Sequence, residues 1–141
     1  MGEIKIFLDS DVIVSALLSE AGASFAILGN LRISKVVTNT IRAEVFEVAR
    51  RLGIDLSQKD IFHDLEIIAL KLDKARLVET YIQYVLDKED SHVVAGAHKS
   101  KVNFLLTHNL KHYRVDEIKT RLGIIVMRPG SFLQYLRSQG V

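Results

Sequence analysis

Hydrophobic residues in this chain gather in short runs separated by longer stretches with helical periodicity. The short runs cover residues 4–8, 35–37, 103–106 and 124–127. Each is bounded by polar or turn residues, which is typical of buried strands in a parallel sheet. Strands that alternate with helices predict an α/β fold, with three α/β/α layers around a central parallel sheet of about four to five strands.

The intervening stretches predict helices with recognisable start and stop signals. Thr38, Asn39 and Thr40 are candidate N-caps of a helix that stops at Gly53. Ser57 and Asp60 resemble a capping box ahead of a helix over residues 61–72. The remaining helices are expected over residues 12–17, 25–31, 74–86 and 91–100, in a short segment ending at 122, and over 130–136.

Length and composition limit the class of protein. The chain has 141 residues, 48% of them hydrophobic, which suits a single domain over residues 1–141 with a sizeable core. It has no cysteine, which excludes disulfides and cysteine nucleophiles and fits a reducing, cytoplasmic location. No apolar stretch approaches the roughly 18 residues of a membrane span, so we expect no membrane partner.

The formal net charge of +2 does not by itself indicate binding to nucleic acid. Its distribution is more informative, because seven basic residues and only two acidic ones fall between positions 98 and 128. This stretch is a candidate for contact with a polyanion. An ordinary solvated surface explains the same pattern equally well.

Acidic residues follow or precede the predicted strands in a suggestive way. Asp9 ends the first apolar run, and Asp90 begins a helix ahead of the apolar run that ends at Thr107. The carboxyl ends of parallel strands form one edge of a sheet, where ligands and chemistry collect. Because carboxylate oxygens suit hard divalent cations, this pattern suggests a metal site.

Three other interpretations of the first acids compete with a metal site. Asp9 alone has the position of a helix N-cap. Asp9 and Asp11 also suit a phospho-acceptor receiver domain, but the strand at residues 35–37 ends in hydroxyl and amide residues rather than the acid that this fold needs. A dinucleotide-binding site is excluded because no glycine-rich turn follows the first strand.

Four segments together resemble the motifs of PIN-domain nucleases, and of VapC-like toxins within that family. The segments are residues 7–18 (FLDSDVIVSALL), 38–44 (TNTIRAE), 87–97 (DKEDSHVVAGA) and 104–109 (FLLTHN). Each motif is weak alone, but their order and spacing match over essentially the whole chain. The resemblance implies an endoribonuclease that hydrolyses RNA phosphodiester bonds with Mg²⁺ or Mn²⁺.

The resemblance also assigns roles to particular residues. It carries the catalytic and metal-ligand roles over to Asp9, Glu44 and Asp90. Supporting roles at the same site fall to Asp11, Ser10, Thr107 and Asn109, and the candidates for RNA contact are Lys99, Lys111 and Arg114. Small members of the family are often toxins, so the implied partners are RNA, a small antitoxin protein and a second copy of the chain.

The chain departs from the family pattern at three positions. Asn109 stands where many relatives have Asp, His112 where another acid is common, and Asp11 where Asn is usual. These changes leave an alternative open, namely a catalytically weakened domain that binds RNA or a protein. His108 and His112 have zinc-ligand spacing only if helical, whereas a loop is expected there. His92 follows Asp90 closely enough to border the site.

Overall fold

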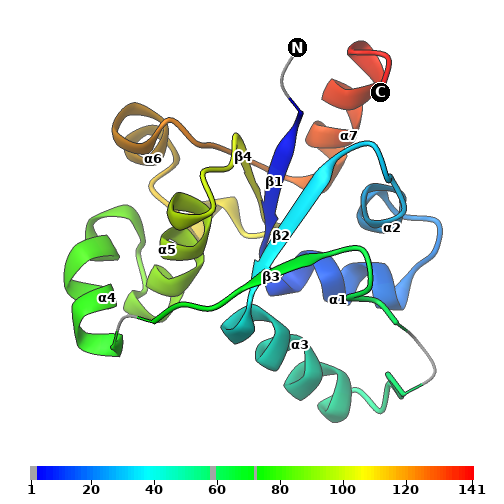
Figure 1. The fold of residues 1–141 in the computed structure, drawn as a ribbon, viewed down its shortest axis with the longest axis horizontal. Coiled ribbons are helices and arrows are strands. Elements are labelled where there is room, and N and C mark those ends of the chain that lie inside the picture. The colour runs from blue at the N-terminus through cyan, green and yellow to red at the C-terminus, as the bar shows by residue number, and fades with distance from the viewer. Residues whose placement is uncertain (1–2, 58–59, 72) are drawn as a thin grey trace.

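The computed structural model describes residues 3–57, 60–71 and 73–141. Its centre is a parallel sheet of five strands in the order β3-β2-β1-β4-β5. The strands are β1 (Lys5–Leu8), β2 (Ser34–Thr38), β3 (Glu66–Ile68), β4 (Phe104–Leu106) and β5 (Ile125–Met127). All of their carboxyl ends therefore lie along one edge, the lower edge of the sheet in Figure 1.

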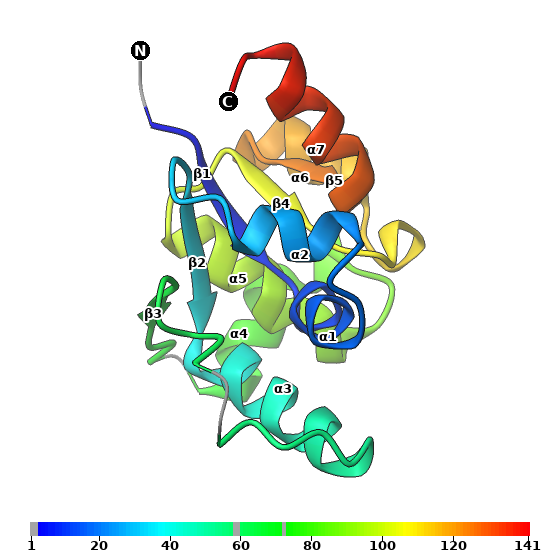
Figure 2. The same cartoon turned by 90° about the vertical axis from the view of Figure 1, so that its right-hand side faces the viewer.

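Helices cover the two faces of this sheet and complete three layers. In Figure 1, α4, α5 and α6 lie to the left of the strands, and α1, α2 and α7 lie to the right; Figure 2 shows α1, α2 and α7 on the near side. The helices are α1 (Ser10–Leu18), α2 (Ala23–Leu28), α3 (Asn39–Arg51), α4 (Lys74–Tyr81), α5 (Ser91–Lys99), α6 (Val115–Leu122) and α7 (Pro129–Ser138). Short 3-10 turns occupy Ile82–Tyr84, Lys88–Asp90 and Leu110–His112.

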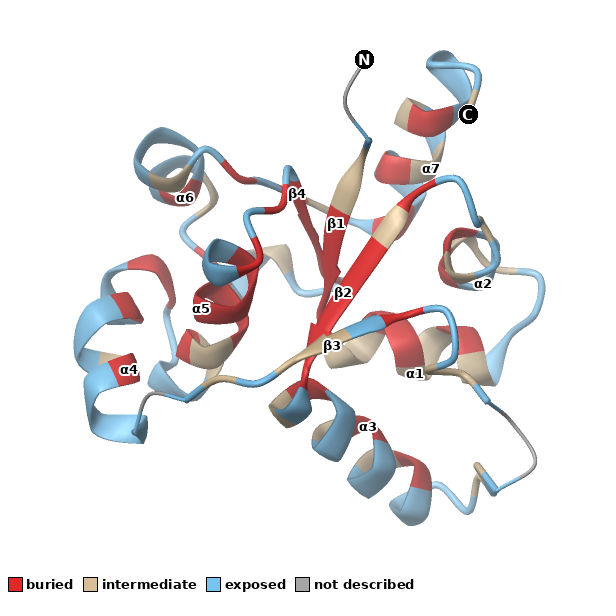
Figure 3. Ribbon diagram, in the orientation of Figure 1, coloured by how far each residue is buried: buried red, intermediate tan, exposed pale blue. Residues whose placement is uncertain are grey.

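The core lies on both faces of the central strands. Ile6, Phe7 and Leu8 of β1 are fully buried, since β1 has strand neighbours on both sides and helices above and below. Figure 3 shows buried residues in red along the strands and on the inward sides of the helices. Burial on both faces explains why these strands are continuous apolar runs instead of alternating patterns.

Gly96 allows α5 to pack closely on the sheet. A Cβ atom at this position would lie 2.6 Å from Cζ of Phe7 and 2.7 Å from Cγ2 of Thr38. Real Cβ atoms do not approach other atoms this closely, so only glycine fits without movement of the sheet or helix. The close contact brings the N-terminus of α5, and with it Asp90, to the carboxyl edge of β1 and β2.

The α/β architecture with a central parallel sheet is confirmed, but the helix predicted over residues 61–72 is wrong. Turns occupy residues 61–64, and Glu66–Ile68 forms the edge strand β3, which pairs with β2. The capping box is also absent, because the Ser57 N–H bonds to Asp55 instead, at 2.9 Å. Residues 58–59 and 72 of the predicted segment lie outside the described residues.

Two other predicted helices are shorter than expected. The second helix ends at Leu28, and Leu31 beyond it is exposed. The helix predicted over residues 74–86 ends at Tyr81 and continues only as a 3-10 turn, after which Val85 forms an antiparallel bridge with Tyr113. Within the described ranges, no helix combines the length and apolar character needed to cross a membrane.

Candidate functional site

Backbone pairing fixes two polar residues at the carboxyl edge of the sheet. The Asp9 N–H donates to the carbonyl of Leu106 at 3.0 Å, and the Thr107 N–H donates to that of Met127 at 3.0 Å. Both residues thus extend the ladders of β1 and β4 by one step. Their side chains meet here, with Thr107 Oγ1 lying 3.0 Å from Oδ2 of Asp9.

Asp9 is buried and held by hydrogen bonds to both of its carboxylate oxygens. Its Oδ1 accepts from the Ser10 N–H at 2.8 Å, which caps the start of α1. Its Oδ2 accepts from the Thr107 hydroxyl and from the Tyr113 hydroxyl, the latter at 2.8 Å. Burial, followed by the nearby charge of Asp9, strongly raises the pKa of Tyr113, which therefore stays a neutral donor.

Asp11 lies beside Asp9 on the first turn of α1. Its Oδ2 is within 3.2 Å of Thr107 Oγ1, of the His108 N–H and, at 3.0 Å, of Asn109 Nδ2. Burial and then the charge of Asp9 raise the pKa of Asp11 to about 6, although the hydrogen bonds from His108 and Thr107 act to lower it. The single hydroxyl proton of Thr107 cannot bond to Asp9 and Asp11 at once. The two carboxylates therefore share one hydrogen-bond donor at this point.

The contact between Asp11 and Asn109 bears on the departure from the family pattern. The resemblance leads us to expect an amide at position 11 and an acid at position 109, whereas this chain has them exchanged. Because the two side chains are in direct contact, the exchange keeps one acid and one amide at this point. The side chain at position 109 thus has an acid, Asp11, within hydrogen-bonding distance.

Asp90 and Glu44 each face a histidine. Asp90 Oδ2 lies 3.6 Å from Nδ1 of His112, and Glu44 Oε2 lies 3.3 Å from Nε2 of His92. Burial, and then the charge of Asp9, raises the pKa of Asp90. The effect of Asp9 places Asp90 in the same electrostatic group as the acids at the end of β1, and His92 borders the site at Glu44.

Three helix N-termini meet the sheet at this edge. Asp9, Thr38 and Asp90 are the N-cap residues of α1, α3 and α5, and Thr38 accepts the Ile41 N–H at 3.1 Å. The amide groups at a helix N-terminus carry a partial positive charge. The parallel topology thus supplies three such ends where the carboxylates gather, which offsets part of their mutual repulsion.

The donor set suits a hard divalent cation, but the side-chain arrangement is not closed around one. Carboxylates from Asp9, Asp11, Glu44 and Asp90 provide the oxygen ligands that Mg²⁺ and Mn²⁺ prefer. Among the described residues, however, no three acidic or histidine side chains converge closely enough to hold a metal ion. Each of these carboxylates instead contacts a hydrogen-bond donor or a histidine. A bound cation would have to replace some of these contacts.

The basic candidates are divided between the two edges of the sheet. Lys111 and Arg114 are exposed and flank His112 and Tyr113, next to the acids. Lys99 is the last residue of α5, a helix that begins beside Asp90, and therefore lies toward the opposite edge. The structure thus does not bring Lys99 to the site.

His108 and His112 have different partners. His108 Nε2 lies 3.3 Å from Oγ of Ser24, while His112 faces Asp90. The segment between them forms a 3-10 turn over Leu110–His112 instead of an α-helix. This arrangement gives no support to zinc bound between the two histidines.

Tyr113 is the site residue that the sequence does not reveal. Its position depends on backbone pairing with the segment before Asp87. The Leu86 N–H donates to the carbonyl of His112 at 3.0 Å, and the Arg114 N–H donates to the carbonyl of Tyr84 at 2.9 Å. These bonds place the Tyr113 hydroxyl beneath Asp9. A single tyrosine in a polar segment carries no local signal of such a role.

Comparisons with known proteins bear on the fold and the family of this chain. In sequence, no curated protein gives a significant match. In structure, the chain resembles a "Toxin-antitoxin complex from Klebsiella pneumoniae", with a TM-score of 0.65, 18% identity, and coverage of 88% of this chain and 97% of that one. It also resembles VapBC2 from Rickettsia felis bound to a DNA fragment from its promoter, with a TM-score of 0.61, 14% identity, and coverage of 89% and 98%. These likenesses support the fold.

The family follows from the sequence match. A model of the PIN domain matches residues 5–111, which include the strands β1 to β4 and all four of the acids described above. The chain therefore belongs to the PIN domain family.

Proposed function

We propose that this protein is a divalent-metal-dependent endoribonuclease. Proteins with a PIN domain are nucleases that generally use divalent metals, and this chain places its acids where the strands of that domain end. The observation that carries the proposal is the cluster of Asp9, Asp11 and Asp90, in which burial and mutual charge raise the pKa of Asp11 and Asp90. The mutual repulsion of such a cluster destabilises the folded protein, and a bound cation would relieve it.

The residues have separable tasks in this proposal. Asp9, Glu44 and Asp90 would hold Mg²⁺ or Mn²⁺, with Asp11 as an additional acid. Such a cation would lower the pKa of a bound water, so that hydroxide is available near neutral pH, and would stabilise the charge that develops on the phosphodiester. Tyr113 and Thr107 orient Asp9 through hydrogen bonds to its Oδ2. Lys111 and Arg114 stand close by as contacts for the RNA backbone.

The biological role we propose is that of a toxin with a small antitoxin partner. Its support is the likeness to two toxin-antitoxin structures, each covered almost completely by this chain. Co-expression with the product of a neighbouring small reading frame tests this role, because a stable complex that suppresses RNA cleavage is expected. A homodimer and a cytoplasmic location remain predictions from the sequence; light scattering measures the first.

A catalytically weakened binding module is the second candidate. It is favoured by the contacts that His92 and His112 make with Glu44 and Asp90, and by the absence of a closed three-ligand group among the described residues. The exchange of acid and amide between positions 11 and 109 argues against a weakened module, because the Asp11 carboxylate still lies beside position 109.

Cleavage of mixed single-stranded RNA separates the two candidates. The wild type is incubated with Mn²⁺, Mg²⁺ or EDTA beside Asp90→Asn and the surface control Glu117→Gln. Metal-dependent cleavage that survives in the control and is lost in Asp90→Asn supports the nuclease. RNA binding without cleavage in any metal supports the binding module.

A further inference from the structure

A cavity of about 360 Å³ opens beside Glu44 and Asp90, between α3, α4 and the start of α5. Leu70, Leu77 and Val78 supply the apolar part of its lining, and Glu44 and Asp90 line it as well. Its volume is at the lower end of the range for small-molecule sites, which is large enough for part of a nucleotide and too small for a duplex. The cavity thus joins an apolar space to the carboxylates of the site.

Specific contacts hold the walls of this cavity in place. The Leu70 N–H donates to Oδ1 of Asn39 at 3.3 Å, which fixes the segment after β3 against the start of α3. Nζ of Lys74 lies 3.2 Å from both carboxylate oxygens of Glu89 and joins α4 to the turn before α5. The space is therefore formed by contacts between elements that the fold already holds together.

We infer that this cavity receives one unpaired nucleobase of the RNA strand whose phosphate lies at the acids, an inference that rests on the proposed nuclease function. A nucleotide combines a flat, largely apolar base with an anionic phosphate, and the cavity presents an apolar wall next to the candidate metal ligands. Lys88 lies at the cavity and supplies a positive charge for the adjoining backbone.

The polar residues of the cavity match the edge of a base. The hydroxyl of Thr40 and the carboxylate of Glu89 line the space and provide acceptors for amino and imino N–H groups. A base reaches such a cavity only after leaving its stack, as bases in single-stranded RNA do. The cavity therefore favours single-stranded over double-stranded RNA and selects at one position along the strand.

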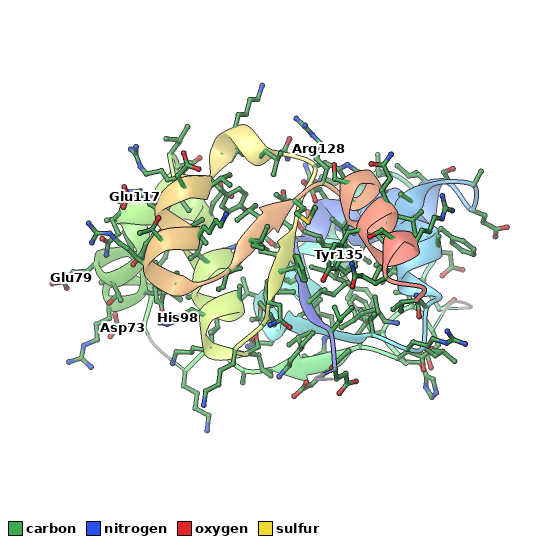
Figure 4. All side chains as sticks on the ribbon, turned by 90° about the horizontal axis from the view of Figure 1, so that it is seen from above. Asp73, Glu79, His98, Glu117, Arg128 and Tyr135 are labelled. Atoms are coloured by element: carbon green, nitrogen blue, oxygen red, sulfur yellow. The ribbon has the colours of Figure 1, made fainter. Side chains whose placement is uncertain are left out.

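The test has two arms: variants of the protein in which a larger side chain fills the cavity, and RNA from which one base is removed. Val78→Phe places a ring in the space, and Leu70→Trp fills it from the neighbouring wall. Glu79→Phe is the matched control, because Glu79 is the next residue on α4, is exposed, and points away from the molecule in Figure 4. Thermal unfolding of all three variants verifies that they fold.

Binding is measured in EDTA by fluorescence anisotropy, with a short single-stranded RNA and versions that each lack one base. In the wild type and in Glu79→Phe, loss of the base at one position should weaken binding about 10-fold, the order expected for burying one base. In Val78→Phe and Leu70→Trp the intact RNA should bind as weakly as that abasic version. Metal-dependent cleavage is measured separately, so loss of the nuclease function is distinguishable from loss of the base site.

Three results would overturn the inference. The first is equal binding of the intact RNA and every abasic version by the wild type. The second is an unchanged abasic effect in both cavity-filling variants. The third is loss of Mn²⁺-induced thermal stabilisation in Val78→Phe while its RNA binding stays equal to that of the wild type, which would assign the cavity to a cation.

Discussion

The hydroxyl of Tyr113 donates a hydrogen bond of 2.8 Å to Oδ2 of Asp9, a residue 104 positions earlier in the chain. This bond joins the end of β1 to the turn that follows β4. Tyr113 is only 5% exposed, and its hydroxyl is paired with Asp9, which also accepts from Ser10 and Thr107. A buried carboxylate without enough hydrogen-bond donors is costly, and the Tyr113 hydroxyl is one of the donors that offset this cost at Asp9.

We expect Tyr113→Phe to destabilise the protein by about 2 kcal/mol, because a hydrogen bond to a charged group is lost while the ring stays in place. Urea unfolding in EDTA measures the change. Tyr135→Phe is the control, since the Tyr135 ring packs on Phe104 and Phe132 in the α7 layer seen in Figure 4. Equal losses in the two variants would show that the Tyr113 hydroxyl does not support Asp9.

Asp11→Asn should stabilise the metal-free protein at pH 7.5 by about 2 kcal/mol and have no such effect near pH 4. The pKa of Asp11 is raised in the folded state to about 6 from 3.8, so folding favours the protonated form. The stabilising contribution of the protonated Asp11 carboxyl to folding is fully present below pH 4 and is lost as the pH rises through 6. The value of about 2 kcal/mol is smaller than the full pKa shift of Asp11 implies, because solvent screens part of the interaction.

Thermal unfolding of the wild type and Asp11→Asn across this pH range checks the sign. The two stability curves should converge on acidification. Curves that stay parallel from pH 4 to pH 7.5 would contradict a raised Asp11 pKa.

Asp90→Asn should abolish the stabilisation that Mn²⁺ gives to the wild type. A ligand that binds only the folded state raises the unfolding temperature, and the effect disappears with the site. The experiment compares thermal shifts in Mn²⁺ and EDTA, with Glu117→Gln as the surface control. An undiminished shift in Asp90→Asn would remove Asp90 from the candidate metal ligands.

The exchange of acid and amide predicts that Asp11 and Asn109 are energetically coupled. Asp11→Asn alone should lower metal-dependent cleavage about 10-fold or more, whereas the double variant Asp11→Asn/Asn109→Asp should recover most of it. A double-mutant cycle on cleavage rates measures the coupling. Additive losses in the double variant would mean that the two positions are not interchangeable.

Gly96→Ala should destabilise the protein by about 3 kcal/mol, because its Cβ would collide with Phe7 and Thr38. Gly130→Ala is the control, since a Cβ there meets no atom within 4 Å and the residue lies in the first turn of α7. Chemical unfolding compares the two. If both substitutions had the same small effect, α5 would have room to move away from the sheet.

Local sequence patterns were sufficient for most of the fold. Strands such as β1 and β4 are buried on both faces, so they are recognisable as apolar runs without knowledge of their neighbours. The edge strand β3 was missed because Glu66, Ile67 and Ile68 are only partly buried or exposed. Its strand conformation depends on pairing with β2, and spaced apolar residues in the same region also fit a helix.

The sequence by itself determined the positions of β1, β2, β4 and β5 and of most helices, and therefore that Asp9 and Thr107 follow strands and that Asp90 precedes a helix. Only the tertiary structure decided which side chains meet at that edge. Tyr113 reaches Asp9, Asn109 reaches Asp11, and the cavity forms beside Glu44 through contacts across long sequence separations. Apolar periodicity is a local property of the chain, whereas hydrogen bonds between distant turns depend on how the sheet brings those turns together.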